Sequence, residues 1–298
     1  MNSQLAKIAK HLQMKPIIDE VGRQIYRAVA SSDYHLLDPF IMLDTGFMKY
    51  PNGFSDHPHR GFQAVAYIRE GVMQHEDFFG NTKPNYAGDV AWINTGKGIM
   101  HAEMPADVPE RVHAFQLWLN LPSHLKLSEP QYAVYPNSSI PVVEQEGVRA
   151  KVISGTGFGI TGPAKSPNNI QYFDITINGK KTVGLTLNPN WSAFLFCING
   201  KAVVNGQDLE GGWSIIFERS QDAQKVSIQA SSDKVELIWL SAVPLGEPIV
   251  HKGPFVMNTQ EEIDQAYEDF EKMQNGFEHR ANFSSKIKAT VEANKNKH

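Results

Sequence analysis

The chain is poor in cysteine and in long apolar runs, and each shortage excludes a class of protein. Its single cysteine, Cys197, cannot form a disulfide within the chain, which favours a reducing compartment. No stretch approaches the ~18 apolar residues needed to cross a bilayer. The segment Met1 to Lys15 lacks the apolar core of a secretory signal. We therefore expect a cytoplasmic protein without a membrane partner.

The chain also lacks an excess of charge of either sign. Its 28 Lys and Arg residues are set against 32 Asp and Glu residues, for a formal net charge of -4. Nucleic-acid-binding proteins usually carry a basic stripe or a high isoelectric point. The one basic stretch, residues 286–298, is a terminal tail of the kind that is usually solvated. No direct binding of nucleic acid is expected.

Glycine and proline are abundant, with 23 and 17 residues, and they separate short apolar runs. These runs have the length and the aromatic and β-branched content of strands. The clearest are residues 64–68, 90–93, 115–119, 193–198, 214–217 and 235–240. Many short strands with turns between them indicate an all-β sandwich or barrel. A chain of 298 residues exceeds what one core usually organises, so two domains are expected.

The domain boundary is predicted in the polar stretch from Glu129 to Ser139. Residues 1–135 would form one β-barrel, and residues 136–298 a second that ends in a helix and a polar tail. Thr259 and Glu262 form a capping box at the start of that helix, and Asn275-Gly276 is its predicted stop. Asn-Gly pairs at 199–200 and 205–206 predict hairpin turns in the second half.

Histidines are concentrated in the first half of the chain, which holds eight of the 11. Pro58 disfavours helix at His57, so His57 and His59 should project from one face of an extended segment. His101 and Glu103 repeat the same i, i+2 spacing, with small Ala102 between them. Two such pairs on neighbouring strands can converge on one ion. Three imidazoles and a carboxylate suit iron, copper, nickel, manganese or zinc, and we rank Fe(II) first.

At these residues the sequence resembles the pirin family of the cupin superfamily. The first matching motif is Asp56-His57-Pro58-His59-Arg60-Gly61-Phe62, and the second runs from Gly88 to Pro105. Further similarity, as at Gly253-Pro254-Phe255-Val256-Met257-Asn258-Thr259, extends it over roughly residues 36–280. The resemblance implies two jelly-roll (cupin) barrels packed together, with metal only in the N-terminal one. It also implies the metal ligands His57, His59, His101 and Glu103.

Members of that family are described as iron-binding, and several as quercetin 2,3-dioxygenases. The resemblance therefore implies an oxygenase acting on a small phenolic or enol substrate. In such a reaction Glu103 could leave the metal transiently and take the substrate's hydroxyl proton, because a carboxylate within hydrogen-bond reach can act as a base. Eukaryotic members are described as nuclear co-regulators of transcription. The alternative is thus an iron-dependent, redox-sensing regulator that binds a protein partner, in the nucleus if the source is eukaryotic. One departure is Gln63, which stands where the family usually has Glu.

Three other residues invite a chemical role and are predicted to be structural. Cys197 lies in an apolar run and is expected in the core rather than as a nucleophile. His113 precedes a strand, where it would support the fold more often than a ligand. His75, followed by two acidic residues, is expected near the barrel rim.

Overall fold

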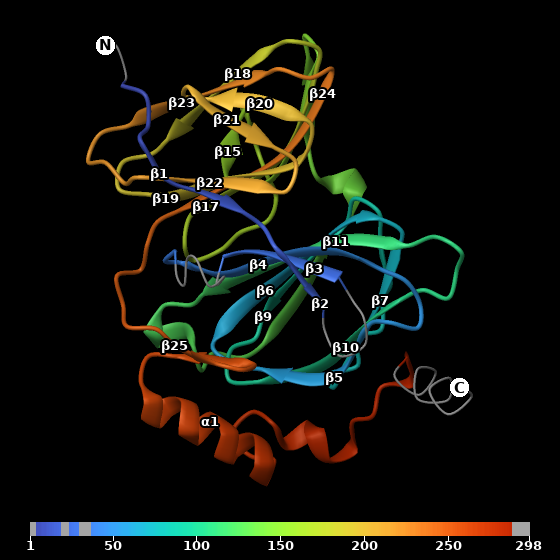
Figure 1. The fold of residues 1–298 in the computed structure, drawn as a ribbon. Coiled ribbons are helices and arrows are strands. Elements are labelled where there is room, and N and C mark those ends of the chain that lie inside the picture. Colours follow the sequence, from blue (N-terminus) through green and yellow to red (C-terminus); the bar gives the residue numbers. More distant parts are fainter. Residues whose placement is uncertain (1–3, 19–23, 30–36, 288–298) are drawn as a thin grey trace. The chain divides into compact units, whose positions relative to one another are not determined.

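The structure is a computed structural model that describes residues 4–18, 24–29 and 37–287, and it confirms the all-β class (Figure 1). The chain divides into two compact units. The first unit comprises Pro16–Arg27, Phe40–Asn137 and Gly246–His298. The second unit comprises Met1–Lys15, Ala28–Pro39 and Ser138–Leu245. In the described part of the chain, no helix is both long enough and apolar enough to cross a membrane.

A seven-stranded and a four-stranded antiparallel sheet form the first unit, together with a short hairpin (Figure 1). The larger sheet has the order β12 (Gln131–Tyr135), β9 (Val90–Asn94), β6 (Phe62–Glu70), β11 (Val112–Asn120), β4 (Phe40–Met48), β3 (Gln24–Val29), β2 (Pro16–Ile18). The smaller sheet has the order β5 (Phe54–His59), β10 (Ile99–Pro105), β7 (Val72–Asp77), β8 (Asn85–Tyr86). The hairpin pairs β25 (Val250–Lys252) with β26 (Phe255–Met257).

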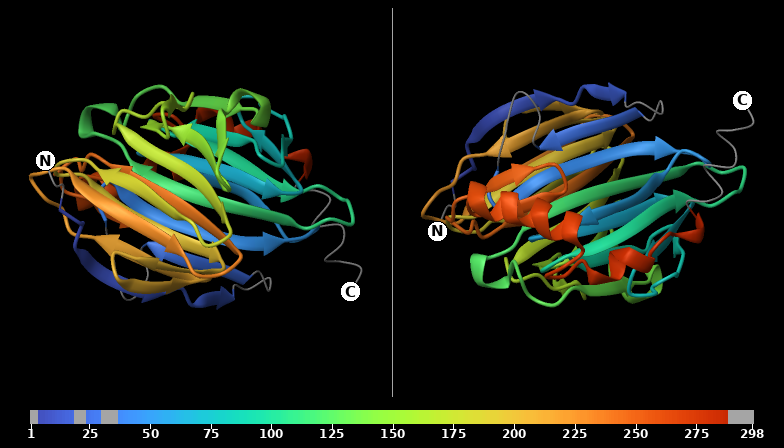
Figure 2. Two further views of the ribbon diagram at one scale, coloured as in Figure 1. Left: turned by 90° about the horizontal axis from the view of Figure 1, so that it is seen from above. Right: turned by 90° about the horizontal axis from the view of Figure 1, so that it is seen from below.

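The second unit also has one sheet of seven strands and one of four. Its consecutive strands from residue 170 to residue 242 are coloured from yellow-green to orange in Figure 2. The larger has the order β1 (Ile8–Gln13), β22 (Trp213–Phe217), β19 (Ser192–Asn199), β24 (Lys234–Ala242), β17 (Ile170–Asn178), β14 (Val148–Ser154), β13 (Val142–Gln145). The smaller has the order β18 (Thr182–Leu187), β23 (Gln224–Ala230), β20 (Lys201–Val204), β21 (Gln207–Glu210). β15 (Thr156–Gly157) and β16 (Ile160–Thr161) form a small hairpin.

Each unit repeats the same run of eight consecutive strands. β4 to β11 and β17 to β24 are arranged alike: the first, third, sixth and eighth strands of each run lie in the larger sheet, and the others in the smaller sheet. This is the two-sheet, eight-strand plan of a jelly roll. All six apolar runs noted in the sequence are strands of the two larger sheets, as predicted. The duplication expected from the sequence is therefore present in the strand order.

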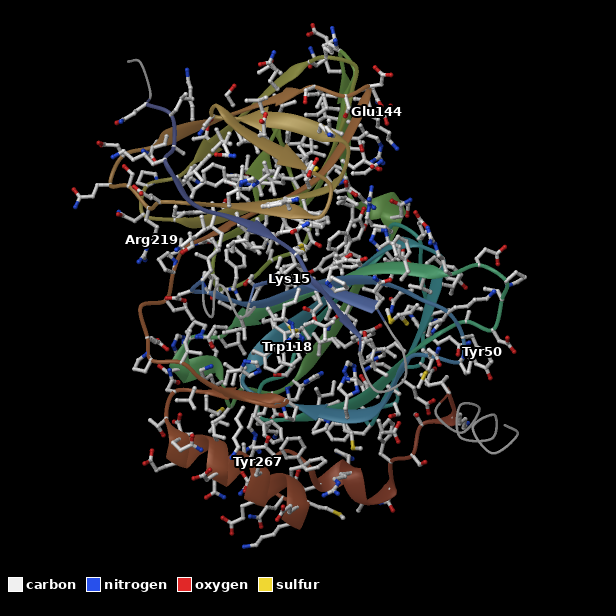
Figure 3. The ribbon with its side chains drawn as sticks, viewed as in Figure 1. Lys15, Tyr50, Trp118, Glu144, Arg219 and Tyr267 are labelled. Atoms are coloured by element: carbon white, nitrogen blue, oxygen red, sulfur yellow. The ribbon has the colours of Figure 1, made fainter. Side chains whose placement is uncertain are left out.

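The two ends of the chain differ from the predicted domain limits. The N-terminal segment Met1–Lys15 belongs to the second unit, and the C-terminal segment Gly246–His298 belongs to the first. β1 pairs with β22 of the second unit rather than with any strand of the predicted domain 1–135. The C-terminal helix α1 (Gln260–Lys272) belongs to the first unit, although it was expected in the second domain. Its buried face, Ile263 and Ala266, joins the core that contains Phe62 and Phe255. In Figure 3, Tyr267 lies on this helix, and its ring packs 4.9 Å from that of Phe255.

The helix begins as predicted and ends earlier than predicted. The Thr259 hydroxyl accepts a hydrogen bond from the Glu262 amide, and the Glu262 carboxylate accepts one from the Thr259 amide. The left-handed C-cap is Met273 rather than the Asn275-Gly276 pair. Asn205-Gly206 does form the turn between the paired strands β20 and β21. The hairpin predicted at Asn199-Gly200 is wrong, because β20 pairs with β21 and β23 instead of β19.

Cys197 lies where it was expected, in the core of the second unit. It is fully buried among residues such as Leu195 and Leu237. Burial raises the pKa of its thiol to about 12, which removes the thiolate needed for nucleophilic chemistry near neutral pH.

Candidate metal centre

Three histidines of the first unit meet on the smaller sheet. Pro58 keeps β5 extended, so the side chains of His57 and His59 lie on one face of this strand. His101, on the neighbouring strand β10, is the direct cross-strand partner of His57. Each of the three imidazoles offers a nitrogen within 4.8 Å of those of the other two. The structure thus brings together three of the four residues singled out in the sequence.

The hydrogen bonding of His57 leaves one of its nitrogens available as a ligand. Nδ1 of His57 donates to the carbonyl oxygen of Ser55 at 2.7 Å, so this nitrogen carries the proton. Nε2 of His57 is therefore the unprotonated nitrogen of this ring, and it lies 3.0 Å from Nε2 of His101. Two ring nitrogens that face each other so closely suit a shared cation, and a hydrogen bond to a backbone carbonyl is the usual way to orient a metal-binding histidine.

Burial keeps the other two imidazoles neutral. His59 and His101 have exposed fractions of 3% and 0%, and this burial, together with the neighbouring His57, holds the pKa of both rings well below the usual value. Metal ligands must be deprotonated, so a pair of neutral imidazoles is prepared to bind a cation without first losing protons. Imidazole nitrogen is a ligand of intermediate softness, so this donor set fits a divalent transition metal such as iron, nickel, copper or zinc.

Glu103 lies close to this group, although not within the same set of mutually close atoms. It follows His101 on β10 after a shift in register against β5. Its carboxylate groups with His101 and with His75, whose ligand atoms lie within 4.8 Å of one another. Burial raises the pKa of the Glu103 carboxyl, an effect that His75 partly opposes. Among the described residues, no single group with this spacing contains all four of the proposed ligands.

His75 is the residue whose place the sequence did not reveal. It was expected near the rim, but its exposed fraction is 2% and it is the cross-strand partner of Glu103. Its ring stacks on Tyr132, with centroids 4.4 Å apart and planes at 8°. Nε2 of His75 lies 3.4 Å from Oδ2 of Asp77. Asp77 is itself fixed, since it accepts hydrogen bonds from the amides of Phe79 and Asn81.

Two of these histidines, His57 and His59, line a cavity inside the first unit. It has a volume of about 290 Å³, near the lower end of ordinary ligand pockets. His57, His59 and Glu103 contribute to its lining, as does Trp118, which lies inside this unit in Figure 3. His113 is outside the lining: Nε2 of its ring lies 3.1 Å from the Thr45 hydroxyl, in keeping with the predicted structural role.

Comparison with known families and proteins gives matches over both units. The family model described as pirin matches residues 22–119, and the model described as the pirin C-terminal cupin domain matches residues 172–276. "Pirin-like protein 2" of Arabidopsis thaliana is 38% identical over 263 residues, covering 86% of this chain and 81% of the relative. Human pirin is 35% identical over 278 residues, covering 90% of this chain and 93% of the relative.

Solved structures with the same arrangement are also found. A quercetin 2,3-dioxygenase from Acinetobacter baumannii is 27% identical with a TM-score of 0.83, over 90% of this chain and 98% of that one. A bacterial pirin, YhhW from Escherichia coli, solved in complex with nickel(II), is 17% identical with a TM-score of 0.63, over 80% of this chain and 97% of that one. The second likeness concerns the fold alone. From the family matches and the identity to its relatives, this chain belongs to the pirin family.

Proposed function

We propose that this protein is a metal-dependent dioxygenase that acts on a small phenolic or enol compound of the flavonol kind. The observation that carries the proposal is the meeting of three imidazoles, two of them buried and neutral, next to a ligand-sized cavity that His57 and His59 line. The likeness to a quercetin 2,3-dioxygenase supports the reaction class. Because one fold serves many chemistries, the site rather than the fold has to carry the argument.

In this proposal His57, His59 and His101 hold the metal, and Glu103 is the fourth protein ligand. When bound, a redox-active divalent metal, with Fe(II) as our first choice, supplies Lewis acidity and one-electron chemistry. The imidazoles present neutral nitrogens, so the site carries little positive charge before a metal binds. The carboxylate of Glu103 then balances part of the charge of the cation.

Glu103 also has the properties of a base for the substrate. Its carboxyl lines the cavity, and burial raises its pKa above that of an exposed glutamate. A carboxylate with a raised pKa accepts a proton more readily, provided that the substrate hydroxyl lies within hydrogen-bond reach. The walls around it are mostly apolar, which strengthens electrostatic interactions inside the cavity. We therefore assign Glu103 the role of taking the hydroxyl proton of the substrate when its carboxylate is not bound to the metal.

Oxygen consumption tests the proposal. Protein loaded anaerobically with Fe(II) should consume oxygen when quercetin is added, whereas the His101→Ala variant should not. His11→Ala removes a histidine of the second unit, which packs on Trp213, and serves as the matched control with normal turnover. Oxygen uptake no faster than that of His101→Ala would reject the dioxygenase. Stoichiometric metal without oxygen uptake would favour the alternative, a redox-sensing regulator that binds a protein partner.

A further inference from the structure

The wall of the cavity that belongs to the larger sheet carries a row of polar side chains. Asp44 on β4 and Gln116 on β11 are direct cross-strand partners, so their side chains lie on the same face. Arg27 lies on β3, the next strand of the sheet. Its Nε and Nη2 donate to the two carboxylate oxygens of Asp44, each at 2.7 Å. All three residues line the cavity, and we call them the polar row.

The polar row is isolated within a largely apolar surface. Its neighbours along β4 and β11 on the same face are Met42 and Trp118, and other lining residues include Ile68 and Met73. Thr45 also lines the cavity, but its hydroxyl already donates to the carbonyl oxygen of Ala114. Placing an ion pair in such a wall costs desolvation energy and is weak evidence of stabilisation. Ligand pockets, by contrast, regularly place a few polar groups in apolar walls to orient a ligand.

The polar row keeps hydrogen-bonding capacity that no described residue uses. The guanidinium group of Arg27 donates to Asp44 through Nε and Nη2. Within residues 4–18, 24–29 and 37–287 its Nη1 has no partner. The carboxamide of Gln116 has none within those residues either, although the side chain is only partly exposed. The row thus offers donors from Arg27 and Gln116, and acceptors from Gln116 and Asp44.

The charges of the row select the kind of group that it binds. Arg27 and Asp44 cancel one another, so the row presents no net positive charge to an anion. A carboxylate placed against Arg27 would also approach the Asp44 carboxylate, and like charges repel. An uncharged edge that carries hydroxyl or carbonyl oxygens meets both donors and acceptors without this repulsion.

The metal-binding side chains line the same cavity from the smaller sheet. His57 and His59 lie on β5 and Glu103 on β10, whereas the polar row lies on β3, β4 and β11. We propose that the polar row determines specificity: the substrate is an enol or phenol with a second, uncharged hydroxyl- or carbonyl-bearing edge that binds Arg27, Asp44 and Gln116. This inference rests on the proposed function, which places the enol or phenol oxygen of the substrate at the metal site. It adds the chemistry of the opposite end of the substrate.

A binding experiment without oxygen tests the row apart from catalysis. Protein loaded with redox-inactive Zn(II) is titrated under argon with three probes that share one metal-chelating 3-hydroxy-4-ketone. These are 3-hydroxyflavone, quercetin, which adds ring hydroxyls, and a 3-hydroxyflavone that carries a ring carboxylate. We expect quercetin to bind most tightly, by about tenfold or more over 3-hydroxyflavone if two hydrogen bonds form.

Variants of the row should remove that preference selectively. Gln116→Leu should lower the ratio of quercetin to 3-hydroxyflavone affinity by about two- to tenfold, as for one lost hydrogen bond. Arg27→Lys keeps the charge but loses the planar fork, and should lower the ratio by a similar factor. Ile25→Val is the matched control, since Ile25 lines the cavity on the same strand as Arg27. It should change the affinity of all probes by one common factor.

The outcomes separate this inference from the proposed function. Equal affinity for quercetin and 3-hydroxyflavone, in wild type and in Gln116→Leu, would overturn the inference and leave the dioxygenase standing. Tightest binding of the carboxylate probe would overturn it as well. A preference for quercetin that depends on Gln116, in a protein that consumes no oxygen with Fe(II), would support the row and reject the dioxygenase. Failure of every probe to bind would contradict both.

Discussion

The two units share the same order of strands and differ in the side chains that these strands direct into the interior. In the second unit, the inward positions of β18 are Val183, Leu185 and Leu187, and those of β23 include Val226 and Ile228. These side chains complete a continuous apolar core. In the first unit, the strands at the same places in the order, β5 and β10, carry His57, His59, His101 and Glu103. The candidate metal centre therefore follows from the side chains and is not a property of the jelly roll.

The difference also has a physical cost. The first unit buries polar groups where the second unit buries apolar side chains, and this costs free energy of desolvation. These groups are the imidazoles, the Glu103 carboxyl with its raised pKa, and the Arg27–Asp44 ion pair in the cavity wall. The first unit gains other contacts from its C-terminal segment. Nη1 of the Arg60 guanidinium, next to His59, donates to Asp269 on α1 at 2.8 Å, and its Nη2 donates to the carbonyl oxygen of Asn275 at 2.7 Å. The comparison suggests that the exchanged helix stabilises the unit that carries the site.

Loss of a histidine should give the largest effect and should be confined to the first unit. His101→Ala removes the residue shared by both groups of close donors, so we expect metal affinity to fall by at least about 100-fold. Calorimetric titration with Zn(II) or Ni(II) measures it, and His11→Ala provides the control. Unchanged metal affinity in His101→Ala would place the metal elsewhere and end the contrast between the units.

A substitution that creates a cavity in the core of the second unit should lower stability and leave metal binding unchanged. Leu187 has an exposed fraction of 1%, and Leu187→Ala should lower the free energy of unfolding by about 2–5 kcal/mol without changing metal stoichiometry. The exposed neighbour Thr186 on the same strand supplies the control variant Thr186→Ala, which should change it by less than about 0.5 kcal/mol. Urea unfolding checks both, and loss of metal binding in Leu187→Ala would show that the second unit takes part in the site.

Buried Lys126 should make the stability of the first unit depend on pH. Its ammonium donates to the carbonyl oxygens of Gly61 and Val256 and to the side chain of Asn120, and burial lowers its pKa from 10.5 to about 8. Between about pH 8 and pH 10 the unfolded chain binds more protons here than the folded chain, so stability from this group rises with pH. The full titration of this lysine should raise the free energy of unfolding by about 3 kcal/mol.

The variant Lys126→Met isolates this effect, because it removes the only group whose titration differs between the two proteins. The difference in unfolding free energy between wild type and Lys126→Met, measured by urea from pH 7 to pH 10.5, should grow in favour of wild type. A difference that stays constant over this range would show that the lysine is charged in the folded protein throughout.

The smallest expected effect is on helix α1, and it tests whether this helix belongs to the first unit. Thr259→Ala removes the hydroxyl that caps α1 and should cost about 1 kcal/mol. Hydrogen exchange should accelerate in residues 246–287 and leave residues 138–245 unchanged. Gln260→Ala, which loses only an exposed hydrogen bond to Asp264, is the control. Faster exchange in residues 138–245 would contradict the assignment of the helix to the first unit.

Local patterns in the sequence predicted the strands and most of the site. The aromatic and β-branched runs are strands, and the i, i+2 spacing at His57 and His59 correctly placed both rings on one face. The capping box fixed the start of α1 because it depends on residues only three apart. Such features are set by neighbours along the chain, and a single sequence contains them in full.

Features that depend on distant pairing were missed. β1 pairs with β22, about two hundred residues away, so nothing near either strand reveals the exchange between units. His75 is placed by its register against Glu103, and its acidic neighbours in the sequence suggested a solvated rim. Arg27, Asp44 and Gln116 belong to three strands and become a row only when β3, β4 and β11 lie side by side. Sequence spacing cannot supply register between strands.

Anomalous diffraction from crystals grown with Fe(II) or Ni(II) would test the central claim most directly. The account predicts one strong peak per chain, among the imidazoles of His57, His59 and His101 and within bonding distance of Glu103, with none in the second unit. A peak bound by His75 in place of Glu103 would revise the ligand set. The absence of any peak at these histidines, in crystals of protein shown to contain metal, would contradict the account.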